Sequence, residues 1–324
     1  MNPKHILPSL AAALFACGTA TAIAQSYPDR PIRMIVPYPP GGSPDALARR
    51  ITQDLEQQLG KPIVVDNRSG ASGLIGIEIA ARSQPNGYTL LAVTSSFTTT
   101  EALQVKPTFT VARDFTAVSL LGEFEGHLLA LHPSVPAKNV PEFIAFAKKS
   151  SQHVTFASSG SANFSRLVGE FFNLKAGTKL VNVPYRGSGP AMLALFSGEV
   201  HSMFVAASIA HGPIKAGKLR AIGSSGTKRL TSLPEVPLIS ESVPDFRIDG
   251  GYVGIVAPAK TPTPIVNRLH GEIKRALANT KTREFYVNGG YIPVDRSPAE
   301  FQKFLEAEVP RFRELGRIAN IKLE

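Results

Sequence analysis

The sequence predicts an α/β fold with two lobes, each built on a doubly wound, mostly parallel sheet with helices on both faces. Short apolar strands alternate with helical segments along the chain, which is typical of such sheets. The alternation starts again after about residue 125. The chain has 324 residues, more than the roughly 250–300 that one hydrophobic core supports. We therefore place the first lobe at residues 27–126 and 247–324 and the second lobe at 127–246.

In the first lobe we expect strands and helices to alternate. The strands lie at residues 33–37, 62–65 and 88–93. The first helix is expected to have Ser43 as its N-cap, followed by a proline at its first position and by Asp45, a carboxylate at the positive end of the helix dipole. Its apolar face carries Leu47, Ile51, Leu55 and Leu59. Gly60 ends this helix, and a second helix follows at 74–82.

The second lobe repeats the pattern. Its strands are expected at residues 128–131, 154–157, 180–183 and 203–206, and its helices at 141–149, 164–174 and 190–197. A strand at 252–256 and two long helices complete the chain. The first of these helices has an apolar stripe from Ile265 to Leu277. The second begins with a capping box, in which Ser297 and Glu300 satisfy each other's backbone amides.

The first residues are typical of an export signal. Lys4 and His5 precede an apolar run at 6–16, and small residues follow at Ala22 and Ala24, so residues 1–24 are expected to be removed after Ala24. This predicts a periplasmic location. The rival interpretation is a membrane anchor, although the run is too short to span a bilayer and contains a proline. Lipidation of Cys17, the single cysteine, is a further alternative.

Composition narrows the classes of function. The chain is 43% hydrophobic and 19% charged, which indicates a folded protein rather than a disordered one. The net charge of +10 is compatible with an anionic partner. The cations are dispersed and tryptophan is absent, which argues against nucleic acid. With one cysteine, in the export signal, a cysteine metal site or thiol nucleophile is excluded from the mature protein.

Motifs of known chemistry do not match. The glycine spacing at 70–76 is G-x-x-G-x-x-G, which differs from the dinucleotide fingerprint, and there is neither a P-loop nor a G-x-S-x-G or H-E-x-x-H motif. The seven histidines are scattered, and we expect each at the surface or in a cap. We therefore expect a protein that is not an enzyme and that uses neither a metal nor a cofactor.

Four polar turns between a strand and the next helix form the candidate site. They lie at residues 37–43, 94–97, 157–163 and 185–190. At such turns the free amides and the positive helix end favour an anion, and glycines let the backbone approach it. Because the turns are divided between two lobes, they indicate one cleft. The candidate ligand-binding residues are Tyr38, Pro39, Gly41, Gly42, Ser43, Asp45, Ser95, Ser96, Ser158, Ser159, Gly160, Ser161, Asn163, Tyr185, Arg186, Gly187, Ser188 and Phe204.

Several motifs resemble, in order, those of the Bug-type solute receptors of tripartite tricarboxylate transporters. They lie at residues 35–45, 67–71, 85–90, 114–115, 183–187, 216–220 and 257–262. The resemblance extends from about Tyr27 to Ile321. It implies a Venus-flytrap receptor of the periplasmic-binding-protein fold that closes around a small carboxylate and performs no chemistry. It also implies that backbone amides and ordered waters of the loops at 38–43 and 158–163 hold that carboxylate.

The resemblance implies transient contact with membrane transporter subunits, and we expect a monomer. A receptor whose closed state signals to a sensor-kinase ectodomain is the alternative function. Arg186 is a candidate partner for a second ligand carboxylate, unless it braces its loop or faces water.

The chain departs from the family pattern at a few positions. Arg166 stands where relatives often have histidine, and Val205 where they often have aspartate. Glu123 and Glu125, near the lobe crossing, are also unusual and either line the cleft or face water. The identity of the ligand therefore stays open.

Overall fold

The computed structural model describes residues 27–151, 153–248 and 251–321. The export signal expected at 1–24 and the alternative of a lipid on Cys17 lie outside the described residues. The described strands form two sheets, one of six strands and one of five.

The six-stranded sheet belongs to the first lobe. Its strands, in spatial order, are β11 (Tyr291–Ile292), β4 (Phe115–Phe124), β10 (Gly251–Pro258), β3 (Thr89–Thr94), β1 (Ile32–Val36) and β2 (Ile63–Asn67). β1 is parallel to β2 and β3. β10 is antiparallel to β3 and β4, and β11 is antiparallel to β4.

The five-stranded sheet belongs to the second lobe. Its strands, in spatial order, are β7 (Val181–Pro184), β6 (Thr155–Ser158), β8 (Ser202–Val205), β5 (Leu128–Leu131) and β9 (Arg220–Ser224). β6 is parallel to β7 and β8, whereas β5 is antiparallel to β8 and β9.

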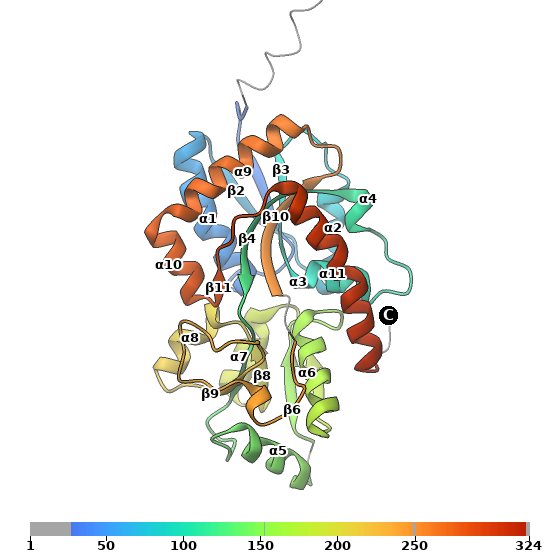
Figure 1. The fold of residues 1–324 in the computed structure, drawn as a ribbon, viewed down its shortest axis with the longest axis vertical. Coiled ribbons are helices and arrows are strands. Elements are labelled where there is room, and N and C mark those ends of the chain that lie inside the picture. The colour runs from blue at the N-terminus through green and yellow to red at the C-terminus, as the bar shows by residue number, and fades with distance from the viewer. Residues whose placement is uncertain (1–26, 152, 249–250, 322–324) are drawn as a thin grey trace, which may run out of the picture.

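The two-lobe α/β fold is confirmed, and the sheets are mixed rather than mostly parallel. Figure 1 shows the two lobes stacked along the long axis of the molecule. β4 carries the chain out of the first sheet into β5, and β10 begins after the chain has returned. β4 runs toward the second lobe and β10 returns from it, so the two strands pair antiparallel. β10 is also antiparallel to β3, and this makes the sheet mixed.

Helices cover both sheets. They are α1 (Ser43–Leu59), α2 (Leu74–Ala81), α3 (Ser95–Ala102), α4 (Val111–Asp114), α5 (Val140–Lys149), α6 (Phe164–Ala176), α7 (Ser188–Ser197), α8 (Ala207–Lys215), α9 (Thr263–Ala278), α10 (Thr280–Asn288) and α11 (Pro298–Ile318), with short 3-10 helices at Ala71–Gly73 and Ile239–Glu241. The helix signals of the sequence are largely confirmed. The capping box of α11 forms, with Ser297 N–H donating to Glu300 Oε2 at 2.9 Å. Gly60 ends α1 in the left-handed conformation.

The sequence signals do not predict β4, β9, β11, α3, α4, α8 or α10. The clearest case is α3, whose serines and threonines are poor helix formers. All of its residues are buried, so packing against its neighbours stabilises this helix. β4 is missed because its buried run has no alternation of apolar and polar residues.

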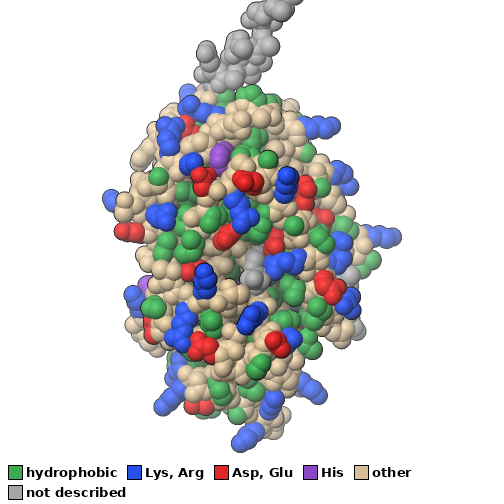
Figure 2. Space-filling view, viewed as in Figure 1, with side chains coloured by type: hydrophobic (Ala, Val, Ile, Leu, Met, Phe, Trp, Pro, Cys, Tyr) green, Lys and Arg blue, Asp and Glu red, His purple; other side chains and the backbone are tan. Residues whose placement is uncertain are grey.

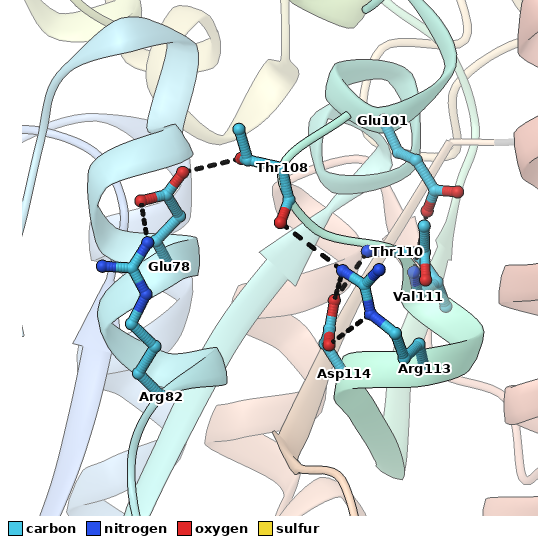
Figure 3. A network of polar contacts seen from close by, with 8 residues as sticks. All are labelled: Glu78, Arg82, Glu101, Thr108, Thr110, Val111, Arg113 and Asp114. Atoms are coloured by element: carbon cyan, nitrogen blue, oxygen red, sulfur yellow. Dashed lines mark hydrogen bonds and ion pairs between the residues drawn. The ribbon is translucent and has the colours of Figure 1, made fainter. Parts of the chain in front are cut away.

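The C-terminal end of α3 is anchored by the polar network in Figure 3. There the Glu101 carboxylate accepts a hydrogen bond from Val111 N–H at 2.8 Å, and burial raises the pKa of Glu101. Thr108 donates to Glu78 on α2 at 2.6 Å. These contacts attach the segment that follows α3 to α2 and α4, so the C-terminal end of α3 is held in place.

One hydrophobic cluster extends through both lobes. It includes Leu91 and Phe301 of the first lobe and Phe172 of the second. Phe164 of α6 and Phe312 of α11 meet with ring centroids 5.2 Å apart. The last helix therefore packs on both lobes, although it follows strands of the first.

Lys and Arg side chains are spread over both lobes on the face shown in Figure 2, among acidic side chains. This distribution matches the dispersed cations of the sequence. In the described part of the chain, the helices are too short or too polar to cross a membrane.

Candidate functional site

The two lobes enclose a cavity that is partly open to solvent. The predicted residues that line it are Tyr38, Ser43, Ser95, Ser96, Ser159, Asn163, Ser188 and Phe204. Each of the four predicted turns supplies at least one of these residues. The turns therefore meet at one cavity.

Helix N-termini from both lobes converge on this cavity. Its lining includes the first residues of α1 (Ser43), α3 (Ser95) and α7 (Ser188) and the N-caps of α6 (Asn163) and α8 (Ala206). Each helix end has a partial positive charge of about half a proton. Among the described residues that line the cavity, none is Asp, Glu, Lys or Arg. The helix ends thus create a positive potential without cationic side chains.

The first turn of α3 is open to a ligand. Its N-cap residue, Thr94, makes no side-chain cap. The hydroxyl oxygen of Ser95 accepts a hydrogen bond from Tyr252 N–H at 3.0 Å, which fixes this end of α3 against β10. At α6, in contrast, the Asn163 side chain already accepts from Ser165 N–H. The backbone amides in the first turn of α3 are therefore more available to a ligand than those of α6.

Two tyrosines supply hydroxyl donors. Burial raises the pKa of Tyr38 to about 12, against an opposing effect of hydrogen bonds with Ser96 and Thr94. Burial also raises the pKa of Tyr291 to about 12, where a hydrogen bond with Ser43 opposes it. Both hydroxyls therefore keep their protons at neutral pH. That of Tyr38 donates to the Ser72 carbonyl at 3.5 Å, a long hydrogen bond that an anion in the cavity can replace.

His127 is a lining residue that sequence reasoning missed. It was expected at the surface or in a cap, but it lies at the crossing from β4 to β5 and lines the cavity. Its ring packs between Phe124 and Phe164, with centroids 4.6 and 5.4 Å away. Burial lowers the pKa of His127 to about 3, so the imidazole is neutral. The sequence feature that could have identified His127 is its position next to Gly126, at the predicted crossing between the lobes.

Other predicted residues line a second hollow beside the cavity. It is lined by Pro39, Gly160, Ser161, Tyr185, Arg186 and Gly187, together with the segment 70–73. Tyr38 and Ser159 line both spaces and lie between them. Arg186 is exposed in this hollow and is not among the residues that line the cavity.

Four predicted residues line neither space and shape the loops instead. The Asp45 carboxylate accepts from Gly41 N–H at 3.0 Å and from Asn67 Nδ2 at 2.9 Å. Burial alone would raise the pKa of Asp45, but these hydrogen bonds and those of Arg49 lower it. The hydroxyl of Ser158 donates to the Gly160 carbonyl within its own loop. Gly42, the fourth, precedes α1.

The lobes contact each other at the edges of the cavity. Ser43 N–H donates to the hydroxyl of Ser188 at 3.3 Å, and the hydroxyl of Ser208 donates to that of Ser43 at 2.6 Å. Elsewhere Ala162 N–H donates to the hydroxyl of Ser72 at 3.3 Å. The structure therefore shows the two lobes in contact, in a closed arrangement.

The residues that depart from the family pattern have separate roles. Arg166 donates to the Ser161 carbonyl at 2.6 Å and so braces the loop before α6. Val205 lines the cavity. Glu123 forms an ion pair with Arg296. Glu125 accepts hydrogen bonds from the backbone and the hydroxyl of Thr231, the latter at 2.7 Å, so it joins the crossing segment to the second lobe.

Comparison with known proteins decides the family. Residues 47–321 match the family model of the tripartite tricarboxylate transporter family receptor. The chain belongs to this receptor family. The resemblance to Bug-type receptors is confirmed, and the family is one of substrate-binding receptors, not of enzymes.

Relatives match the receptor over nearly its whole length. Protein BugT of Bordetella pertussis is 33% identical over 333 aligned positions, which cover 100% of both chains. An adipate-bound protein of Rhodopseudomonas palustris has a TM-score of 0.87 and 29% identity, covering 91% of the receptor and 99% of that chain. MatC of the same species, with bound malate, has a TM-score of 0.84 and 29% identity, covering 89% and 99%.

Proposed function

We propose that the receptor captures a small organic carboxylate in the cavity between its lobes, in the periplasm, and delivers it to subunits of a tripartite membrane transporter. The observation that carries the proposal is the convergence of helix N-termini from both lobes on one cavity. An anion bound there interacts with the positive helix ends of both lobes and so favours closure. Adipate and malate, bound to the two neighbours, are carboxylates of this kind.

The proposed contacts follow from the lining. The amides at Ser95 and Ser96, at the open end of α3, would bind one carboxylate oxygen, and the hydroxyl of Tyr38 is the nearby donor. The start of α6 at Asn163 and that of α7 at Ser188 would bind from the second lobe. Backbone amides form strong charge-assisted hydrogen bonds to carboxylates, so no arginine is needed.

The proposal includes the organisation of the chain. The first lobe comprises residues 27–126 and 247–324 and the second 127–246, which agrees with the membership of the two sheets. The receptor would act as a monomer, contact the transporter transiently and use no cofactor.

A thermal-shift panel tests the capture of a carboxylate. The mature protein is melted with mono-, di- and tricarboxylates, and with nucleotides, sugars and metal ions. A ligand that binds only the folded receptor should add about 2.7 kcal/mol of stability at 100 times its dissociation constant. Melting shifts confined to nucleotides, sugars or metal ions would contradict the proposal.

Delivery needs a separate experiment. Uptake of the labelled acid is measured in cells that contain the transporter, with and without the receptor. Loss of uptake in cells without the receptor is expected. Unchanged uptake would contradict delivery and leave the binding result intact.

A further inference from the structure

One side of the cavity is built of aromatic rings. Tyr291 of β11, Phe124 of β4, His127 of the crossing and Phe164 of α6 all line it. Successive ring centroids are 4.9, 4.6 and 5.4 Å apart. We call these four residues the aromatic wall.

The rest of the lining divides into a polar and an apolar part. The helix ends and their serines form the polar part. Val205 at the end of β8 and Ile209 in the first turn of α8 add further apolar side chains to the lining. A ligand that fills the cavity therefore meets both hydrogen-bond donors and apolar side chains.

His127 supplies a polar group within the aromatic wall. Its backbone is fixed on both sides, because its N–H donates to the hydroxyl of Ser225 at 2.9 Å and its carbonyl accepts from Ser225 N–H at 2.8 Å. Its Nδ1 is buried and has no hydrogen-bond partner among the described residues. The ring itself lines the cavity, which places the imidazole beside a bound ligand and gives it a possible polar partner there.

From these features we propose that the ligand is a monocarboxylate with a neutral, apolar body, such as an aromatic ring, that carries a hydroxyl group for His127. This rests on the proposed function and narrows the class of acid. The carboxylate binds at the helix ends, and the ring packs against the aromatic wall in offset or edge-on geometry. A hydroxyl both donates and accepts, so it pairs with either tautomer of the neutral imidazole.

A second carboxylate is disfavoured by the same surface. Placed against Phe124, Val205 or Ile209, it loses its hydration, and apolar side chains return no hydrogen bonds. The exposed guanidinium of Arg186 belongs to the other hollow.

Calorimetry with matched ring acids tests the class of ligand. The probes are benzoate, meta- and para-hydroxybenzoate, isophthalate and terephthalate, with adipate and malate for comparison. One of the hydroxybenzoates should bind tightest, and at least tenfold tighter than the dicarboxylate with the same ring positions. If any dicarboxylate binds tighter than every monocarboxylate, the inference fails while carboxylate capture stands. If only compounds that are not carboxylates bind, the proposed function itself fails.

The His127→Phe variant tests the hydroxyl contact. It keeps an aromatic ring and removes the hydrogen bond. The affinity of the tighter hydroxybenzoate should fall about three- to tenfold, while that of benzoate should change less than about twofold. His153→Phe, at an exposed histidine of the same lobe, is the matched control and should change neither. Equal losses for both acids in His127→Phe would assign His127 a structural role and overturn the hydroxyl contact.

Discussion

The backbone amide of Ser43, the first residue of α1, donates to the hydroxyl of Ser188, the first residue of α7, across the cleft at 3.3 Å. This contact joins the N-terminus of a helix from one lobe to that of a helix from the other. Ser208 of α8 donates to the hydroxyl of the same Ser43. Closure therefore depends on small side chains at the rim of the cavity.

Gly42 is the position where added bulk should oppose closure. A Cβ atom there would lie 2.8 Å from the Ser188 hydroxyl oxygen. Its φ of −84° is accessible to any residue, so the contact alone matters. Gly42→Ala should weaken carboxylate binding about tenfold, measured by calorimetry, because about 1.4 kcal/mol of overpacking falls on the closed state.

Two further variants control this prediction. Adding Ser188→Ala removes the oxygen that Gly42→Ala would meet, so the double variant should recover most of the affinity. Gly212→Ala on α8, where an added Cβ has no atom within 4 Å, should have no effect. Unchanged binding in Gly42→Ala would show that this rim contact has no part in closure.

Arg186 should affect the rate of binding more than selectivity. It is exposed in the hollow beside the cavity, where its charge can attract an anion without touching it in the bound state. Arg186→Ala should lower the association rate about twofold at low salt and leave the affinity ratio of a mono- and a dicarboxylate unchanged. Stopped-flow kinetics at two ionic strengths measures both. A selective loss of dicarboxylate affinity would instead place Arg186 on the ligand.

Ligand affinity should be constant from about pH 5.5 to 8.5. The titratable groups that line the cavity are His127, with its pKa lowered by burial to about 3, and Tyr38 and Tyr291, both raised to about 12. None changes its charge in this range, and an ordinary carboxylate ligand stays ionised. Calorimetric titrations across the range check this. A tenfold fall in affinity toward either limit would contradict the pKa assignments.

Stability, unlike affinity, should depend on pH through His127. In the unfolded chain its pKa is near 6.5, so below that pH the unfolded state binds a proton that the folded state does not. The folded state therefore loses stability as the pH falls through 6.5. Between about pH 7 and 5.5 the His127→Phe variant should lose about 1 kcal/mol less than the parent in urea unfolding. His201 and His270, whose pKa values burial also lowers, act equally in both proteins. Equal losses would contradict a buried, neutral His127.

Glu101 should matter for stability and little for binding. It pairs with the Val111 amide at the C-terminal end of α3, in the network of Figure 3. Glu101→Ala leaves that buried amide without a partner and should cost about 1–3 kcal/mol in denaturant unfolding. Glu101→Gln, which can still accept the hydrogen bond, should cost less. Glu78→Ala, in the exposed part of the same network, should cost at most about 1 kcal/mol. A large loss of ligand affinity in Glu101→Ala would contradict the separate anchoring of the other end of α3 at Tyr252.

Local signals predicted the regular helices well. α11 begins at a capping box, and α1 begins with a proline in its first turn, signals that depend on neighbours in sequence. The cap expected at Ser43 is wrong, because Gly42 is the N-cap of α1 and no side chain caps that end. α3 was missed because only its burial makes a run of serines and threonines helical. β4 was missed for a related reason, since a strand buried on both faces shows no alternation.

The candidate site was predicted in part. Parallel strands followed by helices place their turns at one edge of a sheet, and this brought Ser43, Ser95, Asn163 and Ser188 to one cavity. The sequence does not show that Tyr38 divides the space, so Arg186 could not be assigned to the other hollow. His127 was missed because its burial results from the packing of both lobes around the crossing.

The crystal structure of the complex with the acid that gives the largest melting shift tests the central claim most directly. The account predicts that a carboxylate oxygen lies about 2.7–3.2 Å from a first-turn amide of α3, at Ser95 or Ser96, with a second contact from the start of α6 or α7. A ligand found in the hollow beside Arg186, or bound to one lobe alone, would contradict it.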